Sequence, residues 1–484
     1  MKDKVLRIVH NALLKAKKTG GLSLHEMGYL SRATAKTEIP QIVLEAPKEE
    51  GHGDFATTIA LSLAKSEKKP PRQIAEIIKN AIEDAEGILE KIEIAGPGYL
   101  NFFIKDSAWL GVLHEIERQG MEYGHCHIGN CKLVQVEFVS ANPTGPLHIG
   151  HGRGAAVGDS LARLLSFTGY DIRCEFYIND FGSQVENLGN SVYFKYRELS
   201  GDAEAAQVLR APESPDEETP GAEYASNLYM GEYITELARE FIGRAEFNAL
   251  SEEEKKNYCR EEGITEMLSR IKATLARFGV TFDEWYSERR LYDTKNNLVE
   301  AAIDELQEKG LVFEEGGAVW LKTTNFGDDK DRVLIRSNGQ TTYFASDIAY
   351  HRDKFERGFK QVIDVWGADH HGYIPRMKAA VQALGHDPDE LQVLLVQLVN
   401  LMREGQPVKM SKRAGTFVTL EEVMDEVGTD ACRFTFMLRR PDSHLDFDLE
   451  LVKSQSSENP VYYVQYAHAR LASVFRQAEE KGIT

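Results

Sequence analysis

Two short motifs in this 484-residue sequence combine side chains that can act on phosphate groups. The first is HIGH at residues 148–151, in which two imidazoles three residues apart flank a glycine. The second is KMSKR at residues 409–413, which offers cationic side chains and a hydroxyl. These groups can neutralise charge on a reacting phosphoryl group, and a glycine lets a flat base approach the backbone. Each motif alone also fits an ordinary surface turn or basic loop, whereas the pair on one domain is much more specific.

Two other phosphate-binding patterns do not occur in the sequence. Gly150, Gly152 and Gly154 give the spacing GxGxG, which differs from the GxGxxG of dinucleotide-binding loops. The sequence also lacks GxxxxGK followed by Ser or Thr. HIGH and KMSKR are therefore the candidate phosphate-binding motifs of this sequence.

The first motif lies between a predicted strand and a predicted helix. Residues 133–139 predict the strand, and the loop after it contains the motif. The helix that follows ends at Gly169, and residues 172–178 predict the next strand. A strand–helix–strand unit of this kind builds parallel sheets, and the amides at the helix N-terminus favour a polyphosphate.

The same alternation returns later in the chain, where KMSKR follows its last strand. Residues 361–366 predict a strand, 374–384 a helix and 391–401 another buried strand. Residues 185–290 are mostly helical and predict an insertion. We therefore expect one α/β catalytic domain with a Rossmann-type, doubly wound parallel sheet over residues 125–440.

Residues 1–115 predict a small α/β domain. Helices are expected at about 3–18, at 55–65 with Asp54 as a cap, and after Pro71, followed by a hairpin around the next Pro-Gly pair. No nucleophile, base and phosphate loop come together here, so a binding role is expected.

The C-terminal part of the sequence predicts helices. From Glu422 onward the pattern is helical, and residues 455–484 predict the start of an all-helical domain whose remainder is missing. Residues 200–223, with three prolines among acidic residues, predict an exposed loop.

Composition limits the class of protein. The sequence is 42% hydrophobic and 27% charged, which is typical of a folded chain, and its net charge of −19 excludes a generally basic nucleic-acid-binding surface. No uncharged apolar run reaches the ~18 residues that a membrane-spanning helix needs. Five scattered cysteines fit a reducing cytoplasm, where we expect the protein to act as a monomer away from membranes.

The two motifs in their contexts resemble the class I aminoacyl-tRNA synthetases, and VEFVSANPTGPLHIGHGRG resembles the arginyl-tRNA synthetases in particular. EEGHGDFATTIA and IAGPGYLNFF resemble that family's N-terminal tRNA-contacting domain. FYINDFGSQ, TTYFASDIAY and WGADHHGYIPRMKAA resemble its catalytic segments, and NPVYYVQYAHAR resembles the start of its anticodon-binding domain. The likeness extends over nearly the whole chain.

The resemblance implies a ligase that joins L-arginine to its tRNA through an arginyl-adenylate, releasing AMP and pyrophosphate. ATP would bring Mg²⁺ with it, and no protein-held metal is expected. The catalytic groups implied are His148, His151, Lys409, Ser411 and Lys412. The ATP contacts implied are Gly145, His148, Gly150, His151, Gly367, Asp369, Met410 and Lys412. The arginine contacts implied are Glu137, Asn142, Tyr343, Asp347 and His370.

The sequence also allows other interpretations of its metal content and its function. His125, Cys126, His127 and Cys131 could suggest zinc, but three adjacent ligands cannot converge without distorting the backbone. The function could be that of another class I synthetase, or of a tRNA-binding paralogue without catalysis. The intact histidines and lysines of the two motifs weigh against the paralogue.

Overall fold

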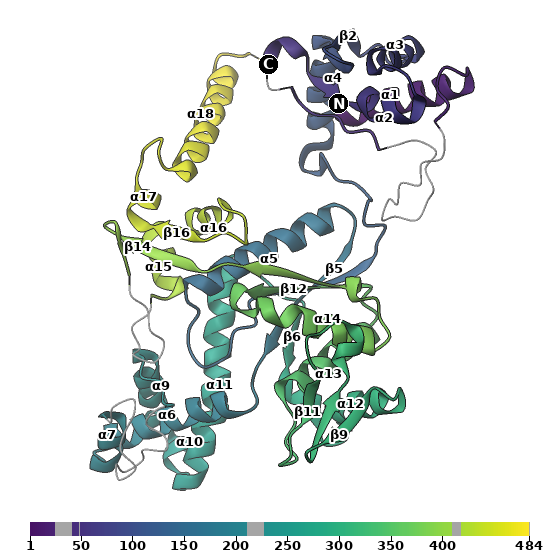
Figure 1. Cartoon of the computed structure of the whole chain (residues 1–484). Helices are drawn as coiled ribbons and strands as arrows, with labels where there is room; N and C mark the ends of the chain where they lie inside the picture. Colours follow the sequence, from purple (N-terminus) through teal and green to yellow (C-terminus); the bar gives the residue numbers. More distant parts are fainter. Residues whose placement is uncertain (25–40, 48, 211–226, 409–417, 484) are drawn as a thin grey trace. The chain divides into compact units, whose positions relative to one another are not determined.

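The computed structural model describes residues 1–24, 41–47, 49–210, 227–408 and 418–483 (Figure 1). The chain forms two compact units, Met1–His125 and Cys126–Thr484.

The first unit packs helices on a three-stranded antiparallel sheet of order β1-β3-β2. Its strands are β1 (Phe55–Thr57), β2 (Leu89–Ala95) and β3 (Tyr99–Ile104). Its helices are α1 (Lys2–Lys18), η1 (Glu50–His52), α2 (Ile59–Glu67), α3 (Pro71–Ala81), α4 (Asp106–Gln119) and η2 (Gly120–Glu122). The helix from 2 to 18, the helix after Pro70 and the hairpin confirm the predictions.

The predicted helix at 55–65 is wrong in its first turn. Residues 55–57 pair with β3 instead, and the helix begins only at Ile59. The Asp54 carboxylate accepts the backbone N–H of Ile104 at 2.7 Å, so it fastens the strand pair and does not cap the helix. Pairing with a strand distant in sequence decided this segment, and a local pattern cannot show that.

The second unit is built on a five-stranded, fully parallel sheet of order β13-β12-β4-β5-β6. The strands are β4 (Leu133–Glu137), β5 (Asp171–Ile178), β6 (Glu284–Ser287), β12 (Gln361–Gly367) and β13 (Leu391–Val396). Read from β6 to β13, these are the third, second, first, fourth and fifth strands of the sheet in chain order, which is the doubly wound arrangement. The fold class expected from the sequence is confirmed.

Helices cover both faces of this sheet. One face packs on α5 (Ile149–Phe167) and α11 (Glu252–Arg277) through a core that includes Val136, Phe138 and Phe176. The other packs on α12 (Leu298–Glu308), α13 (Tyr343–Glu356) and α14 (Ile374–Ala383), the green helices of Figure 1. The sheet is thus the middle of three layers.

Between β5 and β6 the described residues are mostly helical. The helices are α6 (Ser183–Leu199), α7 (Ala203–Arg210), α9 (Glu232–Ile242), α10 (Ala245–Asn248) and α11. Helices α6, α9, α10 and α11 share a core that includes Leu188, Leu237 and Phe241, whereas α7 packs on Phe194 of α6 in a smaller cluster. The predicted loop over 200–223 is wrong for residues 203–210, because Ala205, Val208 and Leu209 bury one face of a helix; residues 211–223 lie outside the described residues.

Smaller elements complete the unit. Beyond β6 these are η3 (Glu288–Leu291), β7 (Tyr292–Asp293), β8 (Asn296–Asn297), β9 (Val312–Glu315), β10 (Ala318–Leu321), η4 (Thr323–Phe326), β11 (Arg332–Ile335), η5 (Ala368–Tyr373), η6 (Pro388–Glu390), β14 (Val399–Arg403), β15 (Gln406–Pro407), α15 (Leu420–Val427), α16 (Thr429–Met437), β16 (Leu445–Asp448), α17 (Leu449–Lys453) and α18 (Pro460–Glu480).

Two predictions in this region are wrong. Residues 391–401 form two strands in different sheets, because β13 joins β12 whereas β14 pairs with β16. The break comes at Gln397, whose N–H bonds to Pro441. The stretch after Glu422 is not all helical either, since β16 runs parallel to β14. Of the apolar residues in α18, Val461 is buried, whereas Leu471, Val474 and Phe475 are exposed.

Candidate active site

The candidate site lies where the strand order reverses, between β4 and β12. In open α/β sheets, ligands bind beyond the carboxyl ends of the strands at such a point. The loop after β4 contains the HIGH motif, and the loop after β12 contains Gly367 and Asp369. The fold thus brings two segments more than 200 residues apart in the chain to neighbouring strands.

The loop after β4 begins with an unusual backbone conformation. Val139 and Ser140 have φ of 68° and 39°, which is rare for residues with a side chain and rarest for a β-branched one. The Ser140 hydroxyl donates to Glu137 Oε1 at 2.8 Å and accepts the N–H of Tyr177 at 3.2 Å. These two hydrogen bonds stabilise the turn at which the loop leaves the sheet. Strained backbone of this kind is often found at functional sites.

The two histidines of HIGH form the N-cap of α5. His148 Nδ1 accepts the N–H of Gly150 at 3.1 Å, and His151 Nδ1 accepts the N–H of His148 at 3.2 Å. The rings stack with centroids 3.7 Å apart. Lys409, Met410, Ser411 and Lys412 lie outside the described residues, but Thr419, shortly after them, bridges to His148, and Leu420 donates to the Leu147 carbonyl at 2.8 Å.

Arg153, on the same helix, is fully buried and joins α5 to two distant loops. Its guanidinium donates to the backbone carbonyls of Gln397, Arg440 and Ser443 at 2.8–2.9 Å. Desolvation lowers its pKa, yet the charge is retained because an arginine stays protonated in proteins. The residue thereby ties the helix that presents HIGH to the chain just before β14 and just before β16.

A cavity of about 490 Å³ opens beside this loop. Of the five predicted arginine contacts, Glu137, Tyr343, Asp347 and His370 line it, and Gly367 is the predicted ATP contact that does so. Tyr343 and Asp347 lie one turn apart on α13, as expected. Asn142 is not in the lining, and its side chain donates to Gln184 Oε1 at 2.6 Å.

A buried ionic network that the sequence did not predict joins residues of the cavity wall to Lys354 behind it. Lys354 Nζ lies 2.5 Å from Glu137 Oε2 and 2.9 Å from Asp364 Oδ1, and His351 Nε2 lies 2.9 Å from Asp364 Oδ2. Burial raises the pKa of Glu137 despite the attraction of Lys354. For Asp364 the attraction of Lys354 and the hydrogen bond from His351 outweigh burial and lower the pKa to about 2.

Two other carboxylates have no cation within ion-pair distance among the described residues. Asp347 accepts a hydrogen bond from the Tyr373 hydroxyl, and burial raises its pKa. Glu288, 3% exposed, has its pKa raised to about 8 by burial and by the negative charges of Asp347 and Asp180. Neighbouring acidic groups that are buried, have a raised pKa and lack a cation can bind one.

Among the described ATP contacts that the sequence predicted, Asp369 lies at the surface and Gly145 lies beside an inserted helix. The Asp369 side chain is 76% exposed and lies 3.6 Å from His370 Nε2. The Tyr233 hydroxyl of α9 donates to the Thr144 carbonyl at 2.8 Å, and a Cβ on Gly145 would lie 3.0 Å from that hydroxyl. The absence of a side chain at position 145 therefore leaves room for Tyr233 of the inserted helix α9.

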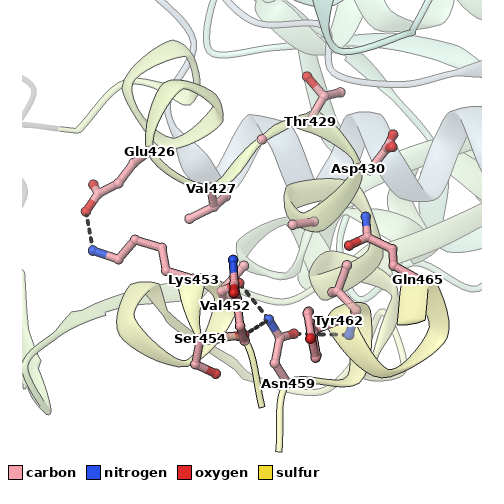
Figure 2. A pocket seen from close by; sticks show the side chains of 14 residues that line it. Glu426, Val427, Thr429, Asp430, Val452, Lys453, Ser454, Asn459, Tyr462 and Gln465 are labelled. Carbon is pink, nitrogen blue, oxygen red and sulfur yellow. Dashed lines mark hydrogen bonds and ion pairs between the residues drawn. The ribbon is translucent and has the colours of Figure 1, made fainter. Parts of the chain in front are cut away.

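A second hollow of about 470 Å³ lies among α15, α16, α17 and α18 (Figure 2). Its polar groups bind one another: Lys453 pairs with Glu426 at 2.9 Å, and Asn459 donates to the carbonyls of Val452 and Ser454. It contains none of the predicted site residues. We therefore assign the chemistry to the first cavity.

The zinc hypothesis gains no support. Within the residues that the structure describes, no group of three His, Cys, Asp or Glu side chains could hold a metal ion. Likewise, no described helix is long and apolar enough to cross a membrane.

Sequence reasoning missed Lys354, Asp364, Tyr373 and Glu288. For Lys354 a signal existed, because Asp347, His351 and Lys354 are spaced i, i+4 and i+7 on one helix and so share a face. For Glu288 none existed, because its importance comes from burial beside residues 60 positions away.

Comparison with known proteins agrees with this geometry. Residues 113–450 match the family model described as tRNA synthetases class I (R), catalytic domain, and residues 10–104 match the arginyl tRNA synthetase N terminal domain. The arginine–tRNA ligase of Syntrophotalea carbinolica is 54% identical over 447 residues, covering 92% of this chain and 77% of the relative. That of Geobacter sp. strain M21 is 53% identical over 448 residues, with the same coverage.

A solved structure shows the same fold. The Thermus thermophilus arginyl-tRNA synthetase superposes with a TM-score of 0.67 over 97% of this chain and 82% of that one, at 22% identity. With the family models matching most of the sequence and curated relatives above 50% identity, the chain belongs to the arginyl-tRNA synthetase family.

Proposed function

We propose that this chain ligates L-arginine to tRNA through an arginyl-adenylate, with the reaction centred at the β4–β12 switch point. The observation that supports this most directly is the cavity on a doubly wound sheet of this family, because its lining contains the cation-free carboxylate of Asp347. Glu288 is buried outside the lining, close enough for the charge of Asp347 to raise its pKa. ATP, arginine and tRNA are the substrates, and Mg²⁺ enters with ATP.

The arginine side chain would enter the cavity. A guanidinium is planar, permanently charged and able to bond two carboxylates at once, which suits Asp347 and Glu288. Glu137, with one oxygen bound to Lys354 and the other to Ser140, would contact the substrate only through remaining lone pairs. Tyr343 and His370 would contact it at the cavity mouth, and Asn142 would hold its α-amino end.

ATP would lie along the loop after β4 and the N-terminus of α5. His148 and His151 would approach the phosphates, with Gly145 and Gly150 leaving room for the nucleotide. Gly367 and Asp369 would face its ribose. Lys409, Met410, Ser411 and Lys412 are proposed to close on the phosphates from the segment between Val408 and Val418.

The chemistry then needs no protein nucleophile. The arginine carboxylate attacks the α-phosphorus of ATP, pyrophosphate leaves, and the terminal ribose hydroxyl of tRNA attacks the adenylate to release AMP. The protein's part is to align the two substrates and to neutralise charge at the phosphorus. Histidines held by a helix cap are pre-oriented for that task.

The domain assignments remain proposals of the same kind. Residues 1–115 would contact tRNA, residues 125–440 would catalyse activation with a helical insertion at 185–290, and residues 455–484 would begin an anticodon-binding domain. A monomeric state and a cytoplasmic location are expected as well.

Amino-acid-dependent exchange of pyrophosphate into ATP, measured with tRNA present, tests this function. We expect exchange with arginine and none with cysteine, glutamate or glutamine, which separates this family from other class I synthetases. Loss of exchange in His151→Ala and Lys412→Ala would locate the phosphate site. Exchange that is absent with every amino acid would favour the non-catalytic paralogue.

A further inference from the structure

Four acidic residues align across four neighbouring strands of the parallel sheet. Asp364 of β12 is opposite Glu137 of β4, Glu137 is opposite Glu175 of β5, and Glu175 is opposite Glu284 of β6. Residues directly opposite in a parallel sheet point to the same face. The row therefore places four carboxylates side by side beneath α13.

The two carboxylates on the β6 side of this row each have a cation of their own, whereas the two on the β12 side share one. Arg290 pairs with Glu284 at 2.6 Å, and Arg357 pairs with Glu175 at 2.6 Å. Asp364 and Glu137 share the single ammonium of Lys354, whose side chain is 0% exposed. The titratable groups around Lys354 are these two carboxylates, Glu175, and Tyr350 and His351 of its own helix.

Lys354 lies behind the wall of the cavity. Glu137 and Asp364 line the cavity, whereas Lys354 contacts them from the side of α13. Its ammonium donates to Glu137 Oε2, and this bond fixes the direction in which the Glu137 carboxylate faces the cavity. Without it, two adjacent buried carboxylates would face one another, and one of them would take up a proton.

We propose that Lys354 is a positioning residue for arginine binding, acting through Glu137 by keeping that carboxylate charged and oriented toward the cavity. The inference rests on the proposed function of Glu137 as an arginine contact. It assigns to a fully buried lysine an effect on one substrate, arginine, and none on ATP.

The test compares Lys354→Met with Arg357→Met. Arg357 directly follows α13, is the cation of Glu175 and lies outside the cavity lining. Steady-state exchange gives KM for arginine and for ATP, and thermal unfolding gives stability. We expect both variants to lose stability. Only Lys354→Met should raise the arginine KM by about 30-fold or more, with an ATP KM within about threefold of the parent. Equal effects of the two variants on arginine KM would overturn the proposal.

A double variant keeps the test valid should Lys354→Met fold poorly. Lys354→Met with Asp364→Asn removes the repulsion between the two carboxylates but still leaves Glu137 without its cation. We expect stability to recover and the arginine KM to stay high, falling as pH rises from 6 to 9 while that of the parent stays flat. A recovered arginine KM with a flat pH profile would mean that Lys354 is merely structural.

Glu137→Gln separates this inference from the proposed function. An unchanged arginine KM in that variant would remove Glu137 from the arginine site, and the proposal with it. A raised arginine KM in Glu137→Gln together with a normal one in the double variant would reject the role of Lys354 alone.

Discussion

Carboxyl groups in the cavity wall and buried beside it are held in different states by their neighbours. Asp364 has its pKa lowered to about 2 because Lys354 and His351 outweigh the effect of burial, whereas Glu288 has its pKa raised to about 8 because burial and two nearby acids act together. A carboxyl group that already has its cation, such as Asp364, gains less from a substrate cation. One that has none gains most when a substrate cation arrives.

Asp347→Asn tests the first of these cation-free groups. The substitution keeps the shape of the side chain and its contact with Tyr373 but removes the charge that a guanidinium would meet. Loss of a buried charge partner costs about 3 kcal/mol, so the arginine KM should rise about 100-fold while the ATP KM changes less than about threefold. Equal changes in both constants would contradict the placement of arginine in this cavity.

Glu288 should make the stability of the ligand-free protein depend on pH. Its pKa is about 8 in the folded state against an ordinary value of 4.5, so the folded protein retains a proton that the unfolded chain has lost. The free energy of unfolding should therefore fall as pH rises from about 4.5 to about 8, by a few kcal/mol in all. Urea unfolding at pH 5 and pH 8.5 should show this fall, and Glu288→Gln should reduce it.

Saturating arginine provides the control for this second prediction. A guanidinium beside Glu288 stabilises the charged form, so the pH dependence attributable to this group should shrink in its presence. A pH profile that is the same in Glu288→Gln and in the parent would show that the group is ionised throughout.

At the level of elements, α5 is the part that aligns the site, and its glycines let it lie close to its neighbours. A Cβ on Gly158 would come within 2.2 Å of the Phe138 ring, whereas a Cβ on Gly154 of the same helix would meet nothing within 4 Å. Since Phe138 directly follows β4, the spacing between helix and strand depends on Gly158.

The two glycines form a matched pair of substitutions. Gly158→Ala should destabilise by about 1–3 kcal/mol through overpacking, and it should lower exchange activity because the helix that presents HIGH must shift. Gly154→Ala should be neutral or stabilising by up to about 1 kcal/mol, because alanine favours a helix more than glycine does. Chemical unfolding of both variants checks the order; a more stable Gly158→Ala would contradict it.

How far the sequence predicted these elements depended on whether the cause was local. The strand before HIGH, the helix after it and the hairpin of the first unit follow from periodicity and turn residues, so they were predicted. The division of 391–401 into two strands was not, because it arises from contacts of Gln397 with Pro441 and Arg153. The Lys354 network was missed for the same reason: Glu137 is 217 residues away.

At the level of the whole molecule, charge is divided unequally between the two units. Residues 1–125 contain 17 basic and 18 acidic side chains, so nearly all of the net charge of −19 belongs to residues 126–484. A polyanion such as tRNA is repelled by an acidic surface and gains from phosphate contacts with Lys and Arg. Contacts with tRNA phosphates should therefore face the least electrostatic repulsion on the almost neutral first unit.

Removal of the first unit should consequently separate tRNA binding from small-substrate binding. Each unit has a hydrophobic core of its own, with Val9, Ile78 and Phe102 in the first and Val136, Phe176 and Phe436 in the second, so residues 126–484 should fold alone. Every described residue that we assign to arginine or ATP lies in this second unit.

Filter binding at about 0.1 M salt should show at least a tenfold loss of tRNA affinity relative to the chain of residues 1–484. Calorimetry should show ATP binding within about threefold. Equal tRNA affinity for the two proteins would mean that the acidic unit binds tRNA by itself and that residues 1–125 have another role.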